Sequence, residues 1–139
     1  MKGPYEFIDH TADILIKAFG NDISECFENA SKAMFDIITD NSKIKNIGQY
    51  NIRLKAPDLE QLLVDWLSEL LFLNSTNNLV FGYFKLKIDA KHSILEAKIF
   101  GEEFNRNRHK NGLEIKAITY HMLKVNNKKP FSVQVLFDI

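Results

Sequence analysis

Side chains that could bind a metal ion or move a proton are concentrated in the fragment DHTADI, residues 9–14. Two carboxylates, Asp9 and Asp13, lie there with the imidazole of His10 and the hydroxyl of Thr11, between two apolar runs. Asp and Thr side chains often satisfy backbone groups in tight turns. Carboxylates are also the ligands that Mg2+ and Ca2+ prefer. The local pattern favours a turn and leaves a site for a hard cation as the alternative.

A second concentration of negative charge lies at the end of the sequence, VQVLFDI. Terminal residues usually fray, yet the alternation typical of a strand continues here to the last residue. Asp138 and the carboxylate of Ile139 are adjacent, and two such groups repel each other unless they share a cation. We therefore treat this strand end as a second candidate for cation binding.

Lys116 is predicted to lie beside these terminal acids. A hairpin turn at residues 126–129 pairs Val125 with Pro130, and this register puts Ile139 opposite Lys116 and Asp138 opposite Ala117. A register shifted by one residue puts Asp138 opposite Lys116 instead. Lys116 is also explained as an ordinary cross-strand ion partner, which at an exposed site stabilises by only a few tenths of a kcal/mol.

Motifs of the familiar catalytic classes are absent from the sequence. It contains no H-E-x-x-H, no paired C-x-x-C, no glycine-rich phosphate loop and no G-x-S-x-G elbow. The four histidines have no spacing typical of zinc ligands, and His121 is expected to be a core or edge residue of a strand. The segment 101–112 is expected to be a solvated loop, and its basic residues offer an anion or partner contact as the alternative. Those residues are Arg106, Arg108, His109 and Lys110.

The composition limits the classes of partner. The chain has 139 residues, a typical size for one domain, so residues 1–139 are predicted to form a single unit. Lys and Arg together number 18, as do Asp and Glu, so any contact with RNA must be local. The single Cys26 is expected to be a small buried apolar residue in a reducing compartment. No signal peptide or membrane span is recognisable, and the chain is expected to be cytoplasmic.

These candidate residues must be positioned by strands and two helices. The spacing predicts strands on both sides of the DHTAD turn, helices over 22–39 and 58–73 with a strand at 49–56 between them, a turn at 74–78, and then two hairpins. The expected fold class is α+β, a largely antiparallel β-sheet with two α-helices packed on one face.

Several separated motifs, taken together, resemble the archease family. They are YEFIDHTADILIKAFG, APDLEQLLVDWLSELLFL, RHKNGLEIKAITYHMLKV and the terminal FDI, and the resemblance covers essentially the whole chain. It implies the archease-like α+β fold. It also implies that the protein is a non-catalytic cofactor of the RtcB-type RNA ligase, which joins tRNA halves and other RNAs.

The resemblance further implies a site and a role. Archeases assist the metal-dependent guanylylation of the ligase, which uses GTP, and so sustain multiple turnover. The implied metal ligands are Asp13, Asp138 and Ile139, and the ion is Ca2+, with Mg2+ or Mn2+ as alternatives in the cell. Lys116 is implied to take part in ligase activation, whereas Asp9 and His10 are expected to be neighbours of the site. The segment 101–112 departs from the more acidic, proline-containing loops expected of the family.

Two other functions remain open on the sequence. A general chaperone or RNA-binding adaptor is suggested by the basic residues of 106–110, although the net charge of zero argues against strong RNA affinity. A metal-dependent hydrolase using the same acids lacks an activated nucleophile or a recognisable substrate pocket. If the protein is a cofactor of the ligase, tRNA is contacted only through the ligase, and no membrane is involved.

Overall fold

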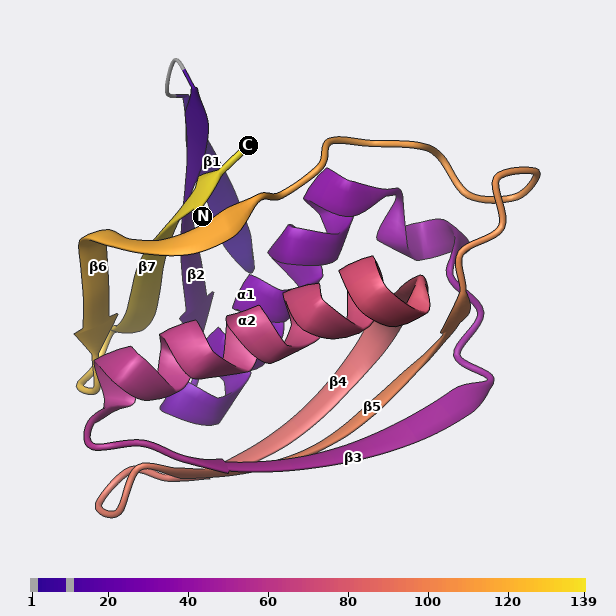
Figure 1. The fold of residues 1–139 in the computed structure, drawn as a ribbon. Coiled ribbons are helices and arrows are strands. Elements are labelled where there is room, and N and C mark those ends of the chain that lie inside the picture. The colour runs from indigo at the N-terminus through magenta and orange to yellow at the C-terminus, as the bar shows by residue number, and fades with distance from the viewer. Residues whose placement is uncertain (1–2, 10–11) are drawn as a thin grey trace.

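The computed structural model describes residues 3–9 and 12–139, which form seven strands, two α-helices and one short 3-10 helix (Figure 1). The elements in chain order are β1 (Tyr5–Asp9), β2 (Asp13–Gly20), α1 (Ile23–Ile38), η1 (Asn41–Lys43), β3 (Gly48–Lys55), α2 (Leu59–Asn77), β4 (Leu79–Asp89), β5 (Ile94–Glu103), β6 (Ala117–Asn126) and β7 (Phe131–Asp138). The predicted α+β class is confirmed.

The strands divide into two antiparallel sheets rather than one. The first sheet has the order β1-β2-β7-β6, and the second has the order β3-β5-β4. Both helices contact strands of both sheets, so they fill the angle between the sheets (Figure 1). The pairing of β3 with β5 and of β2 with β7 joins segments far apart in the chain, which is why the alternation of single strands did not reveal the division.

Each helix begins at an aspartate and buries an apolar stripe. The Asp22 carboxylate accepts a hydrogen bond from the amide of Glu25 at 2.8 Å, and Asp58 accepts one from Gln61 at 2.8 Å. These side chains satisfy amide groups that the first turn of a helix leaves without backbone partners. None of the helices in the described part of the chain is both long and apolar enough to cross a membrane.

One hydrophobic core is shared by both helices and both sheets. Trp66 of α2 is fully buried, and its indole nitrogen donates to the Ser31 hydroxyl of α1 at 2.8 Å. Ser31 in turn donates to the carbonyl of Phe27 at 2.8 Å, so every polar atom of this contact between the helices has a partner. Cys26 lies in the same core and is fully buried, as predicted.

The outer edge of β4 is hydrogen bonded to side chains of α1. The amide of Leu86 donates to the Glu28 carboxylate at 2.9 Å, and the amide of Ile88 donates to the Ser24 hydroxyl at 3.0 Å. Burial raises the pKa of Glu28, although the bond from Leu86 acts in the opposite direction. Two amides of an edge strand are thereby satisfied within the molecule.

The segment 104–116 runs from the second sheet to the first across the C-terminal end of α1 (Figure 1). The amide of Gly112 donates to the carbonyl of Ile38 at 3.0 Å, and the amide of Leu113 donates to the carbonyl of Ile37 at 2.9 Å. The end of a helix otherwise leaves such carbonyls without backbone partners. A Cβ atom on Gly112 would lie 2.3 Å from the carbonyl oxygen of Ile37. Glycine is therefore required for this close approach.

The end of α2 differs from the prediction. A turn was predicted over 74–78, but α2 continues through residues 74–77. The helix ends at Asn78, which adopts the left-handed conformation, and the Asn74 side chain donates to the carbonyl of Leu79.

The hairpin of β6 and β7 also departs from a regular register. Val125 pairs with Val133, not with Pro130, and an irregularity between Thr119 and Lys124 then restores Ala117 to a position opposite Asp138. The Gln134 side chain, which donates to the carbonyl of Met122 at 2.8 Å, satisfies the backbone within this irregularity. The register at the end of the chain therefore agrees with the first alternative, by way of an insertion that the sequence did not reveal.

Candidate functional site

Two carboxylates from opposite ends of the chain meet at one end of the first sheet. Asp13, the first residue of β2, pairs directly with Asp138, the last residue of β7. Residues directly opposite each other in antiparallel strands share a face, with Cβ atoms about 4.5–5.5 Å apart. Asp138 is exposed, and Asp13 is half-buried. Like charges in this arrangement destabilise a sheet, so the pair favours a cation between them.

Ile139 and Asp13 line the same cleft, which has a volume of about 620 Å³. The cleft lies between this end of the first sheet, the C-terminal end of α1 and the segment 110–113. The carbonyl end of a helix carries a partial negative charge, which also favours a cation. The cleft therefore places the carboxylate of Asp13 and the residue Ile139 beside the C-terminal end of α1, which also carries negative charge.

Asp36 of α1 is a further carboxylate in this cleft, which the sequence did not single out. It accepts hydrogen bonds from the Tyr5 hydroxyl and, at 3.2 Å, from the amide of Asn41. Burial and the adjacent Asp36 raise the pKa of Tyr5, so this hydroxyl remains a donor at neutral pH. The helical spacing of Asp36 made it one polar position among several on α1, and only the packing of β1 against α1 distinguishes it.

Lys116 lies next to the pair through its backbone. Its amide donates to the carbonyl of Asp138 at 2.7 Å, and the following residue, Ala117, pairs with Asp138. The Lys116 side chain is exposed and does not line the cleft. The structure thus brings the four predicted residues to one end of the sheet, with the lysine free to turn toward a partner.

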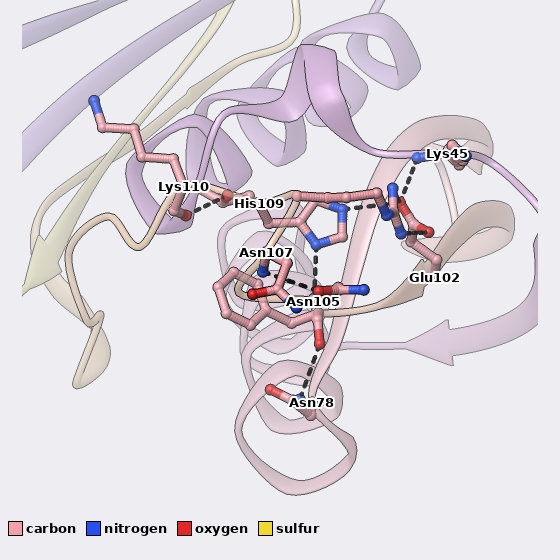
Figure 2. Close-up of polar contacts among 10 residues, drawn as sticks. Lys45, Asn78, Glu102, Asn105, Asn107, His109 and Lys110 are labelled. Carbon is pink, nitrogen blue, oxygen red and sulfur yellow. Dashed lines mark hydrogen bonds and ion pairs between the residues drawn. The ribbon is translucent and has the colours of Figure 1, made fainter.

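Beyond the end of β5, the segment 101–112 is a mostly exposed loop, as expected, but a buried histidine fixes its path (Figure 2). His109 is 3% exposed, and its Nδ1 accepts from the amide of Asn105 at 2.8 Å. Nε2 therefore carries the proton and donates to Glu102 at 2.8 Å. Glu102 also accepts from Arg108 and from the amide of Lys45, and these bonds, chiefly the one from Arg108, lower its pKa to about 2.

This network explains the histidine and one of the arginines of the segment. His109 and Arg108 hold Glu102 and so fix the path of the chain toward α1, where the carbonyl of Lys110 accepts from the Thr39 hydroxyl. The side chains of Arg106 and Lys110 are exposed and take no part in this network. The sequence did not predict this arrangement, because the pairing of Glu102 with His109 depends on a turn at residues 105–109.

Among the other predicted candidates in the described part of the chain, Lys110 lines the cleft and His121 does not. His121 is exposed on β6, an edge strand, as expected. His10 and Thr11 lie outside the described residues, and Asp9 is described only as the last residue of β1. Residues 3–9 and 12–139 contain no group of three or more His, Cys, Asp or Glu side chains placed to hold a metal ion. The predicted set differs from such a group, because its third ligand is the end of the main chain.

Comparison with known proteins identifies relatives over nearly the whole chain. The model of the Archease protein family matches residues 5–139. The chain is 40% identical over 136 residues to "Protein archease" of Sulfolobus acidocaldarius, covering 97% of this chain and 98% of that protein. It is 42% identical over 140 residues to "Protein archease" of Methanosarcina barkeri, covering 97% and 95%.

A solved structure agrees with these sequence matches. The solution structure of Protein 1598 of Methanobacterium thermoautotrophicum superimposes with a TM-score of 0.83 at 35% identity, covering 98% of this chain and 99% of that one. The agreement extends over both sheets and both helices, because almost every residue of each chain is included. Sequence and fold together show that the chain belongs to the archease family.

Proposed function

We propose that this protein activates an RtcB-type RNA ligase by promoting its metal-dependent guanylylation with GTP, and that it catalyses no reaction itself. Membership of the archease family supports the proposal. The single observation that carries it is the direct pairing of Asp13 with Asp138 beside Ile139, at one accessible end of the first sheet. Such a tip can enter the active site of a partner without a large change of shape.

Asp13, Asp138 and Ile139 are the residues proposed to hold a divalent cation. The ion best suited is Ca2+, with Mg2+ or Mn2+ as alternatives in the cell, because all the ligands are oxygen atoms. When bound, the ion supplies positive charge that offsets the repulsion of the carboxylates and can attract phosphate oxygens of GTP. The chain itself contributes the pairing of β2 with β7, which places Asp13 beside Asp138.

Apolar side chains around the cleft are suited to contact the ligase. Phe7, Ile8 and Leu113 line the cleft and are 48%, 36% and 52% exposed. An interface of this kind buries little area, so we expect a transient complex. Lys116, exposed beside the tip, is proposed to contact a phosphate or an acidic group of the ligase. At this tip the RNA substrate is reached only through the ligase.

The test is multiple-turnover ligation, and GMP loading, by the cognate ligase with and without this protein. Asp13→Ala and Asp138→Ala are each expected to reduce the stimulation at least tenfold. Glu60→Ala, which removes an exposed carboxylate from the first turn of α2, is the matched control and should stimulate as the wild type does. Full stimulation by both aspartate variants would exclude the proposed tip.

A second variant tests the end of the chain. Two residues added after Ile139 move the terminal carboxylate away from Asp13 while leaving every side chain of the cleft in place. We expect the extended protein to lose both stimulation and Ca2+ affinity. An extended protein that retains both would remove the terminal carboxylate from the site and leave the two aspartates as its ligands.

A further inference from the structure

The outer face of the second sheet carries a group of basic side chains. Successive residues of a strand point to opposite faces, and here Ile52, Leu86 and Ala97 point inward to the core. Both helices lie on that inner side (Figure 1). The outward basic positions, all exposed, are Arg53 and Lys55 of β3, Lys85 and Lys87 of β4, and Lys98 of β5.

The register brings these charges together across all three strands. Lys85 of β4 lies directly opposite Lys98 of β5, although like charges at such positions destabilise a sheet. Glu96 is the one carboxylate near the centre, and it lies opposite Arg53 on one side and Lys87 on the other. Among the described residues, none of these basic side chains forms an ion pair within 4.0 Å, because the ion pairs found there involve other side chains. The sheet thus holds more positive charge than its own acids balance.

Two aromatic rings continue this basic face toward one end of the sheet. Tyr83 and Phe100 are directly opposite each other, two residues along from Lys85 and Lys98. Their ring centroids are 5.6 Å apart with an angle of 56° between the planes. Tyr83 is 48% exposed, so its ring is accessible from solvent. The two rings lie on the same surface as the lysines.

A shallow depression of about 600 Å³ lies between the charges. Its polar lining comes from all three strands and consists of Asn51, Arg53, Lys85, Lys87, Glu96 and Lys98. A flat surface with a wide depression does not enclose a small molecule, but it can follow an extended chain. The surface therefore fits a long, anionic ligand that lies across the strands.

We propose that this face, formed by Asn51, Arg53, Tyr83, Lys85, Lys87, Glu96, Lys98 and Phe100, binds single-stranded RNA. The four central cations contact phosphates, and the rings of Tyr83 and Phe100 stack on bases. An acidic protein segment would use the cations and leave the rings without matching groups. Duplex RNA hides its base faces within the helix, so the two rings again would find no partner.

The proposal is compatible with the overall charge of zero, because the cations are concentrated on one face. It differs from the anion contact suggested for 101–112, where His109 and Arg108 are engaged with Glu102. It is also independent of the proposed metal site, which lies on the other sheet. Binding is therefore measured with this protein alone, and its outcome does not depend on stimulation of a ligase.

The experiment measures fluorescence anisotropy of a labelled 20-nucleotide oligouridylate at several salt concentrations. Four phosphate contacts predict a slope of log affinity against log salt of about −2 to −3, since each contact contributes roughly −0.7 for single strands. Lys85→Gln with Lys98→Gln should reduce the magnitude of the slope by about 1.4. Tyr83→Ala should weaken binding roughly 5- to 150-fold with the slope unchanged.

Lys124→Gln with Lys128→Gln is the matched control, because it removes the same charge from exposed positions of β6 and of the turn that follows it, away from the proposed face. It should bind as the wild type does, and circular dichroism checks that all variants are folded. Loss of binding in the control equal to that in Lys85→Gln with Lys98→Gln would overturn the proposal. So would the absence of binding by the wild type, or competition by polyglutamate as strong as by unlabelled oligouridylate, which would indicate an acidic protein partner.

Discussion

At the scale of residues, function and stability depend on carboxylates in contrasting surroundings. Asp13 and Asp138 are directly opposed, so their like charges repel each other. Glu102 receives hydrogen bonds from Arg108, His109 and Lys45 and needs no cation. The same chemical group therefore serves as a candidate ligand in the cleft and as a structural acceptor in the segment that leads to it.

Asp13→Asn should abolish the stabilisation of the protein by Ca2+. A ligand at about 100 times its Kd adds roughly 2.7 kcal/mol to the free energy of unfolding, which raises the Tm by several degrees. We expect this increase for the wild type and for Glu60→Gln, and not for Asp13→Asn or Asp138→Asn. The measurement is thermal unfolding by circular dichroism with Ca2+ or with EDTA. Equal Ca2+-dependent increases in all four proteins would argue against the assigned ligands.

Glu102→Gln should destabilise the protein at neutral pH and much less in acid. The Glu102 pKa is lowered to about 2, so its charge stabilises the fold above the usual glutamate pKa near 4.5, and this contribution is lost as the pH falls toward 2. At pH 7 we expect a loss of about 1 to 3 kcal/mol in the free energy of unfolding by urea. Glu103→Gln, at an exposed neighbouring position, is the control. A loss that is the same at pH 3 and pH 7 would contradict this account.

At the scale of elements, the parts predicted from sequence are those determined by neighbours along the chain. The bounds of α1 agree with the prediction to one residue at each end, because an apolar stripe and the cap at Asp22 define them. The turn predicted at 74–78 was wrong over 74–77, which are helical, because the helix end depends on Asn78 and on a contact with Leu79. The pairing of Asp13 with Asp138 follows from no local pattern, and only the family resemblance suggested it.

Ser31→Ala should weaken the contact between the two helices. The substitution leaves the buried indole N–H of Trp66 without its acceptor, which costs about 1 to 3 kcal/mol. Urea unfolding followed by tryptophan fluorescence measures the change. Ser68→Ala, on the exposed face of α2, should change the stability by less than about 0.5 kcal/mol. Equal effects of the two substitutions would show that the hydrogen bond contributes nothing.

Gly112→Ala should loosen the segment that crosses the end of α1. The added Cβ would lie 2.3 Å from the Ile37 carbonyl oxygen and 2.7 Å from that of Ile38, so the backbone must move, at a cost of about 1 to 3 kcal/mol. Faster exchange of the Leu113 amide hydrogen should accompany the loss of stability. Gly3→Ala is the control, because the nearest atom to an added Cβ there is the Tyr5 carbonyl oxygen, 3.9 Å away. Unchanged exchange at Leu113 would contradict the close approach.

At the scale of the whole molecule, one core joins two sheets with different surfaces. The first sheet ends in the acidic cleft, and the second carries the basic and aromatic face. Both helices contribute to the core between them, so neither sheet buries its apolar side without the other. The sequence predicted the number of helices and the antiparallel pairing, but not that the two candidate surfaces belong to separate sheets.

Thermal unfolding should therefore occur in a single transition. Far-ultraviolet circular dichroism reports on all elements, and fluorescence reports on Trp66, the only tryptophan, at the centre of the core. The two signals should give the same Tm, because small domains with one core unfold cooperatively. Two separate midpoints would show that the sheets unfold independently.

The hydrogen bonds from Leu86 and Ile88 to α1 have a consequence for solubility. An edge strand with free amides can recruit a strand from another copy of the chain, which is the first step toward fibrils. On β4 two of these amides are engaged by Glu28 and Ser24, so α1 shields the strand against such growth. The helix that borders the acidic cleft thus also protects the protein from self-assembly at the opposite sheet.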